Sequence, residues 1–295
     1  MGLRAALLYE LSQRLLPPPA ERTIDYKAYQ AWRVQSLSSS WSSFAGTDLR
    51  GKDVLDFGCG DGALGLFLAT TMGPRSVTGV DLVPTSIASA KAAQSATQIP
   101  PGVQVDFMVG SPQGLPVAAE SMDVLVAFDC LEHVMSPLAI LRDWRRVLRP
   151  GGICLLEWFP FKGPWGPHME ALIPVPWAHV LFGQGAMFEA AQRMYDSPRF
   201  VPRHWDIDDQ GQKKPNKWQN WSSFKEQGYI NELDIATFRD LVREAGLEIV
   251  SLETRSFSGS AWRRGLGWLL MHIPLIGEYF VSYTVIKLRR PCAPT

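Results

Sequence analysis

Apolar residues recur along the chain with two alternating periods between about residue 50 and residue 160. Short runs of apolar and β-branched residues are typical of buried strands, and longer segments with apolar residues every three or four positions are typical of amphipathic helices. Five strands are expected here, at residues 54–57, 76–80, 103–108, 123–129 and 153–158. Strands that alternate with helices in this way require a parallel sheet with helices on both faces.

The same pattern returns near the end of the chain. Residues 234–245 predict a helix that Gly246 caps, residues 247–254 predict a sixth strand, and residues 280–288 alternate as a final, antiparallel strand would. The fold class expected is therefore α/β, with a Rossmann-like, doubly wound, seven-stranded and mostly parallel sheet.

Two stretches depart from this pattern. Residues 159–232 are rich in proline and in aromatic residues, and they predict a helical cap inserted after the fifth strand. In residues 258–279, Arg263 and Arg264 precede a run of Trp, Leu and Ile. That run suits an apolar lid over a hydrophobic acceptor or a segment at a membrane interface, but also a helix packed on the core or at a homodimer interface.

The first sixteen residues predict an amphipathic helix with leucines on one face, which stops at three consecutive prolines. A signal peptide is disfavoured because Glu10 and Arg14 interrupt the apolar positions. No stretch approaches the roughly 18 uncharged apolar residues that a membrane span needs. Tyr26, Tyr29 and Trp32 follow in a polar segment.

Charge and cysteine usage exclude some classes of protein. The 295 residues carry 29 basic and 29 acidic side chains, and zero net charge argues against an enzyme of nucleic acids. The four cysteines, at positions 59, 130, 154 and 292, are far apart and lack the spacing of a metal site. Free thiols in a reducing cytoplasm are expected.

The candidate chemistry begins at the end of the first strand, where Gly58, Gly60 and Gly62 precede a helix. Strand, glycine turn and helix present bare backbone and a helix N-terminus to a nucleotide. Asp81 ends the second strand about 20 residues later, where a carboxylate can accept hydrogen bonds from a ribose diol. With Ala63, the glycines also fit the dinucleotide fingerprint, so this stretch alone leaves a nicotinamide or flavin enzyme open.

Four segments in order resemble the motifs of class I S-adenosylmethionine-dependent methyltransferases: residues 54–62 (VLDFGCGDG), 79–81 (GVD), 129–134 (DCLEHV) and 146–152 (RVLRPGG). The resemblance covers about residues 45–160 and is greatest to the quinone-methyltransferase-like branch, which acts on small molecules. It implies S-adenosylmethionine as cofactor.

The resemblance also implies roles for individual residues. The backbone at Gly58, Cys59 and Gly60 would face the methionine part of the cofactor, and Asp56 would lie near its ammonium group. Asp81 would bind the ribose and Leu82 would flank the adenine. Ser111 stands where the family often has an aspartate that contacts the adenine amino group. Phe128 and Asp129 would border the methionine moiety.

A general base is needed only where the acceptor must lose a proton. The candidates are His133, just past the fourth strand, and His168, beyond the fifth. A purely structural role is the alternative for each of them. His179 and His204 are weaker candidates. Residues 204–209 have metal-ligand residue types but predict a solvated loop, so no metal site is expected.

These observations predict a cytoplasmic methyltransferase, either free or peripheral to a membrane, that modifies O, N or C of a small, rather apolar metabolite. A secondary metabolite, a quinone-like ring and a lipid or glycan intermediate all remain open. The alternatives are a non-catalytic module that binds S-adenosylmethionine and an NAD-dependent oxidoreductase. The expected organisation is residues 1–50 as helices over the cofactor site, 51–158 as the cofactor-binding core, 159–232 as the cap, and 233–295 as the rest of the core with the apolar insertion.

Overall fold

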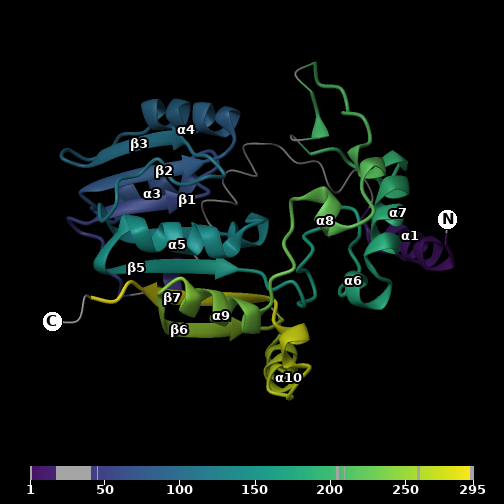
Figure 1. Cartoon of the computed structure of the whole chain (residues 1–295). Coiled ribbons are helices and arrows are strands. Elements are labelled where there is room, and N and C mark those ends of the chain that lie inside the picture. Colours follow the sequence, from purple (N-terminus) through teal and green to yellow (C-terminus); the bar gives the residue numbers. More distant parts are fainter. Residues whose placement is uncertain are drawn as a thin grey trace. The chain divides into compact units, whose positions relative to one another are not determined.

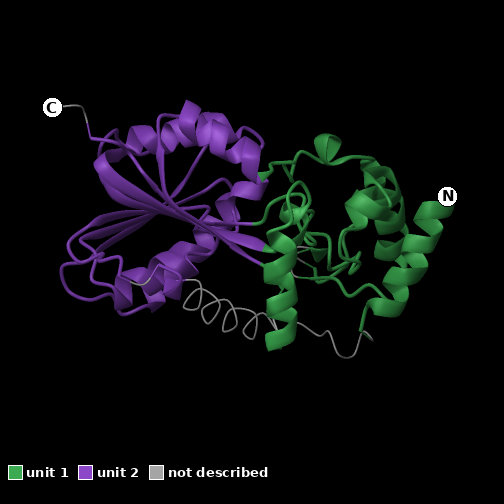
Figure 2. Ribbon diagram, turned by 90° about the horizontal axis from the view of Figure 1, so that it is seen from below, with its two compact units in different colours: residues 1–29, 159–234, 256–282 green, residues 30–158, 235–255, 283–295 purple. Residues whose placement is uncertain are grey.

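A computed structural model describes residues 2–17, 41–44, 46–203, 206–208, 210–257 and 260–292 (Figure 1). The chain divides into two compact units, which Figure 2 colours separately. Unit 1 contains residues 1–29, 159–234 and 256–282, and unit 2 contains residues 30–158, 235–255 and 283–295. We describe each unit by itself.

Unit 2 is built on a seven-stranded sheet with the order β3-β2-β1-β4-β5-β7-β6. The strands are β1 (Asp53–Phe57), β2 (Ser76–Asp81), β3 (Gln104–Val109), β4 (Met122–Phe128), β5 (Leu148–Trp158), β6 (Glu248–Arg255) and β7 (Tyr283–Arg289). The first five pair in parallel, and β7 pairs antiparallel with both β5 and β6. The expected fold class is confirmed.

The turn predicted at residues 150–152 is instead part of β5, which begins five residues before the expected start. The pairing of β4 with β5 shifts register between Met122 and Val124, opposite this segment. Gly151 has a φ of 79°, a conformation that glycine adopts without strain. The glycines therefore form an irregularity within a strand, as glycines in strands often do.

The helices of unit 2 are α3 (Ala63–Thr71), α4 (Pro84–Ala96), α5 (Pro137–Val147) and α9 (Ile235–Glu244), and each contacts the sheet (Figure 1). α5 also contacts α9, so these two cover the same face. Helix α5 buries Leu141, Trp144 and Val147, which recur at the expected spacing. The ring of Trp144 meets that of Phe57 edge-on, with centroids 5.1 Å apart.

In the described part of unit 1, helices are joined by long irregular segments. Its helices are α1 (Leu3–Leu15), α6 (Ala178–Leu181), α7 (Gln184–Asp196), α8 (Phe224–Gln227) and α10 (Ala261–Met271). Aromatic residues of the cap pack together in its core: Phe188 meets Phe224 at 5.1 Å, and Tyr195 meets Phe200 at 4.5 Å between ring centroids. The predicted helical, aromatic-rich insertion is thus confirmed.

Helix α1 packs against α7 within unit 1. It buries Leu8, and Leu16 just beyond its end is buried as well, but the side chains of Leu3, Leu7 and Leu15 are exposed. A role for this segment over the cofactor site stays a prediction. Tyr26, Tyr29, Trp32 and His204 lie outside the described residues. Among the helices that are described, none is both long and apolar enough to cross a membrane.

Candidate functional site

The glycine turn after β1 has the predicted conformation. Gly58, Gly60 and Gly62 have φ angles of 72°, 53° and 80°, which L-residues rarely adopt. The surroundings of these glycines differ. A Cβ on Gly58 would stand 2.3 Å from Sγ of Cys130, and one on Gly62 would stand 2.7 Å from the ring of Phe107, whereas one on Gly60 would meet nothing within 4 Å. Gly58 and Gly62 are therefore required by packing, and Gly60 leaves bare backbone facing open space.

Asp81 joins the turn to the end of β2. Its Oδ2 accepts a hydrogen bond from the Gly60 amide at 3.0 Å, and its Oδ1 accepts one from the Val83 amide at 2.9 Å. The half-buried carboxylate is fixed in orientation, and each of its oxygens retains a second lone pair. A ligand hydroxyl can therefore bind here without displacing the backbone contacts.

Exposed apolar side chains surround Asp81. Leu82 and Val83 follow β2 with 57% and 48% of their surface exposed, and Val109, the last residue of β3, is 45% exposed. Hydrogen bonding from the Gly110 amide to the Asp81 carbonyl, at 2.8 Å, ties the two strand ends together. Apolar side chains beside a fixed carboxylate are what a flat nucleoside base next to its ribose requires.

Asp56 is 2% exposed, and its Oδ2 lies 3.2 Å from the position that a Cβ on Gly65 of α3 would occupy. The carboxylate therefore lies against the first turn of a helix, where the backbone amides favour negative charge. Its predicted place near an ammonium group is not tested by this geometry.

Carboxylates gather around the two cysteines of the site. Burial, with the charges of Asp56 and Asp81, raises the pKa of Cys59, and burial followed by Glu132 and three aspartates raises the pKa of Cys130 well above its usual value. Both thiols therefore stay protonated at neutral pH and are not nucleophiles. The same carboxylates make this end of the sheet negative, which favours a cationic ligand.

The remaining predicted cofactor residues differ in what they offer. Phe128 is 4% exposed, and its ring stacks on Phe44 at 5.5 Å in the core, so any contact that it makes with a cofactor falls to its backbone. Asp129 is half-buried with a φ of 51°, in the left-handed region that aspartate adopts more readily than most residues other than glycine. Ser111 is exposed, and its Oγ accepts a hydrogen bond from the Gln113 amide at 3.2 Å within its own turn.

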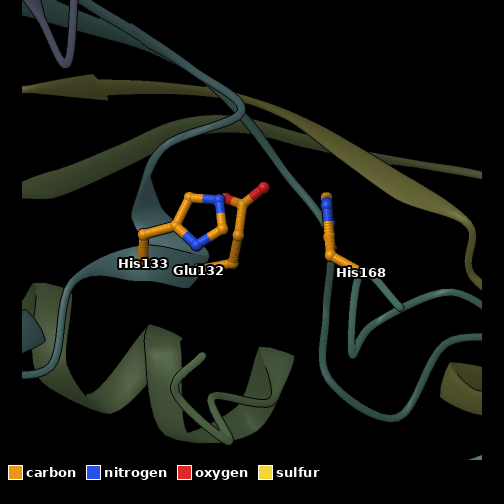
Figure 3. A group of neighbouring side chains, drawn as sticks. All are labelled: Glu132, His133 and His168. Atoms are coloured by element: carbon orange, nitrogen blue, oxygen red, sulfur yellow. The ribbon is translucent and has the colours of Figure 1, made fainter. Parts of the chain in front are cut away.

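His133 ends the short helix η2 (Leu131–His133), which follows β4. Figure 3 shows its ring beside Glu132, and a ring nitrogen lies within 4.8 Å of a carboxylate oxygen of Glu132. Glu132 is only 1% exposed. The sequence alone assigned no role to Glu132. It stands directly before His133 in the motif at residues 129–134, and a carboxylate next to a candidate base was the signal that could have indicated one.

His168 belongs to unit 1 and is the third side chain in Figure 3. Its φ is 51°, and its ring meets Phe159 edge-on at 4.6 Å, so packing within unit 1 fixes the ring. The other cap histidine described, His179, is 9% exposed, and burial lowers its pKa from 6.5 to about 4. His179 lines a small hollow with Met169, Ile173 and Met187, which has no room for a ligand the size of a cofactor.

Comparison with known proteins identifies the domain. Residues 55–156, which contain the glycine turn, Asp81 and η2, match the family model described as a methyltransferase domain. Residues 55–156 thus form a methyltransferase domain, similar to that of S-adenosylmethionine-dependent methyltransferases. The matched residues run from β1 to near the end of β5, all within unit 2.

Two relatives show how far the likeness extends. An uncharacterized methyltransferase of Mycobacteroides abscessus is 31% identical over 139 residues, which are 47% of this chain and 52% of that protein. The ubiquinone biosynthesis O-methyltransferase of Xanthomonas oryzae pv. oryzae is 40% identical over 113 residues, which are 37% of this chain and 44% of that protein. The chain thus spans about half the length of the curated relatives that it matches.

Solved structures bear on the fold alone. An S-adenosylmethionine-dependent methyltransferase from Mesorhizobium loti superimposes with a TM-score of 0.51 at 16% identity, covering 87% of this chain and 96% of that one. Likeness of this kind agrees with the strand order of unit 2, in which β7 runs antiparallel beside β5. In a dinucleotide-binding sheet the corresponding strands are all parallel.

Proposed function

We propose that the protein transfers a methyl group from S-adenosylmethionine to a small, rather apolar acceptor. The observation that carries this proposal is the carboxyl end of β1 and β2, where Asp81 is fixed by the amides of Gly60 and Val83 beside exposed Leu82 and Val109. Open space over Gly60 suits a ligand that approaches the backbone closely.

Charge supports this choice of cofactor. S-adenosylmethionine carries a positive sulfonium and an ammonium group, and Asp56, Asp81, Asp129 and Glu132 bring negative charge to the same end of the sheet. When bound, the cofactor supplies an electrophilic methyl group. The chain's own contribution would be orientation, which can supply up to roughly 7–11 kcal/mol when two reactants are held in line.

For an acceptor that must lose a proton, we propose His133 or His168 as the base. Beside His133, the buried carboxylate of Glu132 would orient the ring and stabilise the imidazolium that forms when the ring takes a proton. His168 would act from unit 1, where its ring is held against Phe159. Neither role requires a metal ion.

The acceptor class rests on two supports. One relative described above is a ubiquinone biosynthesis O-methyltransferase, and we infer a quinol-like hydroxyl as the first acceptor to test. Unit 1 is rich in aromatic and aliphatic side chains, which suits a flat or lipidic molecule.

Calorimetry with the purified chain tests the proposal. We expect S-adenosylmethionine and its demethylated product to bind at micromolar affinity and NAD not to bind. Binding of NAD with none of S-adenosylmethionine would refute the cofactor assignment. Tight cofactor binding without transfer to any quinol, catechol, amine or lipid acceptor would instead favour a non-catalytic binding module.

A further inference from the structure

Helix α10 of unit 1 turns its apolar stripe toward water. Trp262, Leu266, Leu269 and Ile273 follow one another at spacings of four, three and four residues, which places them on one face of the helix and its continuation. Their exposed fractions are 70%, 45%, 58% and 38%. An amphipathic helix of a globular protein normally buries this stripe, so the orientation calls for a partner.

The packing of α10 enforces this orientation. Gly267 is the buried residue of the helix, and a Cβ there would stand 2.1 Å from Oγ of Ser256. Any larger side chain at position 267 would force the helix away from the preceding segment. Behind it, the indole of Trp177 donates a hydrogen bond to the Tyr279 carbonyl at 2.6 Å and meets Phe257 edge-on at 6.0 Å.

The turn after α10 ends in an exposed leucine with an unusual backbone. Leu275 is 100% exposed and has a φ of 69°, a region that costs a leucine conformational energy. A hydrogen bond from the Gly277 amide to the Ile273 carbonyl, at 2.8 Å, closes the turn. Gly277 permits this because a Cβ there would stand 2.1 Å from the Met271 carbonyl oxygen. The fold thus holds a strained apolar tip in water, and Ile276 beside it is 45% exposed.

The charged side chains of α10 and the turn after it are all basic. Residues 260–277 contain no aspartate or glutamate, whereas Arg263 and Arg264 are exposed on α10. Trp268 on the same helix is 60% exposed, and its ring meets that of His272 at 4.4 Å. Tryptophans and aliphatic side chains flanked by arginines complement a bilayer whose headgroups are anionic.

We propose that α10 and the turn through Ile276 form a membrane-binding surface for an anionic lipid bilayer. The helix would lie in the plane of the interface, with its stripe and Leu275 among the acyl chains and its arginines at the phosphates. This inference goes beyond the proposed function and does not rest on it, because it concerns where the protein binds and not what it methylates.

Co-sedimentation of the full chain with vesicles tests the surface. We expect binding to vesicles of phosphatidylcholine and phosphatidylglycerol in equal amounts, and weaker binding to phosphatidylcholine alone. Leu269→Ser with Leu275→Asn should lower the partition coefficient by about tenfold or more, because two apolar side chains are lost from the interface. Asparagine tolerates the backbone of position 275, so folding should persist.

The matched control is Leu3→Ser with Leu7→Ser, which removes two exposed leucines from α1 of the same unit. This control should bind vesicles as the wild type does. If the α1 pair and the α10 pair of substitutions reduce vesicle binding equally, the assignment of the surface to α10 is overturned. Arg263→Gln with Arg264→Gln should remove the preference for the anionic vesicles. Melting curves check that each variant is folded.

Two further outcomes would overturn the proposal. One is a wild-type protein that stays in the supernatant with both kinds of vesicle. The other is a wild-type dimer in light scattering that the α10 pair converts to a monomer, with no vesicle binding by either, since the stripe would then be an interface between copies of this chain. Cofactor affinity, measured in parallel, would be unaffected in every case.

Discussion

Units 1 and 2 place their exposed apolar side chains differently. Of the eighteen large hydrophobic residues that are exposed in the described part of the chain, thirteen belong to unit 1 and five to unit 2. In unit 2, Leu82, Val83, Val109 and Met135 follow or end elements at the carboxyl edge of the sheet. In unit 1 they concentrate on α1, on α10 and in the turn after α10.

This difference shows what each unit contributes. In unit 2 the exposed apolar residues lie next to a fixed carboxylate, as the proposed site for a flat cofactor requires. In unit 1 they form an extended surface next to arginines, without acidic residues between positions 260 and 277. We therefore propose that unit 2 carries the chemistry of methyl transfer and that unit 1 attaches the protein to a membrane. His133 and His168 provide the strongest test of this division, because they are both candidate bases and belong to different units.

The largest expected effect is on turnover, and it tells which of the two units provides the general base. If His133 of unit 2 is the base, His133→Ala lowers turnover by about 10²-fold or more, removes the acidic limb of the pH profile and leaves cofactor affinity intact. If His168 is the base, His168→Ala has these effects and the division between the units fails. Transfer of a labelled methyl group to a catechol acceptor provides the measurement.

A matched control for both variants is His272→Ala, which removes an exposed histidine at the end of α10. Loss of cofactor affinity in His133→Ala, with turnover at saturation unchanged, would show that this residue only shapes the cofactor site. Full turnover in both variants would mean that the acceptor needs no base.

The next effect concerns the glycine turn of unit 2. Gly58→Ala should lower the free energy of unfolding by about 2–4 kcal/mol, because a strained φ is combined with a collision against Cys130. Gly60→Ala, with the same sign of φ and open space, should cost only about 1 kcal/mol. Urea unfolding measures both values, and equal losses would show that packing against Cys130 contributes nothing.

Asp81→Ala should weaken cofactor binding by about 1.5–3 kcal/mol, the scale of hydrogen bonds to a charged group. The effect combines the lost ribose contact with release of the Gly60 amide. Asp106→Ala, which removes an exposed carboxylate from β3, is the control and should bind the cofactor normally. Calorimetry decides, and an unchanged dissociation constant in folded Asp81→Ala would rule out the ribose role.

The smallest expected effect is on stability, and it compares how the two units respond to acid. Burial lowers the pKa of His179 to about 4, so the unfolded chain takes up its proton first, near 6.5. The contribution of neutral His179 to the free energy of unfolding is fully present above pH 6.5 and is lost as pH falls toward 4. About 1–2 kcal/mol of stability is lost by pH 5. His179→Phe should flatten the fall in melting temperature between pH 7 and pH 5, and an unchanged slope would contradict this assignment.

Unit 2 should resist acid further. Arg75, with Ser76 and Arg149, holds the pKa of Asp53 well below its usual 3.8. Because this pKa is depressed, the contribution of Asp53 is present above pH 3.8 and is lost only as pH falls further. Hydrogen exchange that detects opening of unit 1 before unit 2 between pH 6 and pH 4 would support the comparison.

The sequence by itself determined most of unit 2. Apolar runs predicted its strands, the glycines predicted the turn, and the position of Asp81 predicted a carboxylate at a strand end, which hydrogen bonds to Gly60 and Val83 now fix. These features are local, since each depends on residues close together in sequence or on the rule that parallel strands end at one edge. The ring of Phe128 is different, because its burial against Phe44 depends on a distant segment.

Only the tertiary structure decided what unit 1 does with its apolar residues. The sequence of α10 shows a stripe of Trp262, Leu266, Leu269 and Ile273, and such a stripe ordinarily predicts burial. Periodicity reports that one face is apolar but not what that face meets. Here the close approach of Gly267 to Ser256 turns the opposite face inward, because only a residue without a side chain fits there, and the stripe is left to face water.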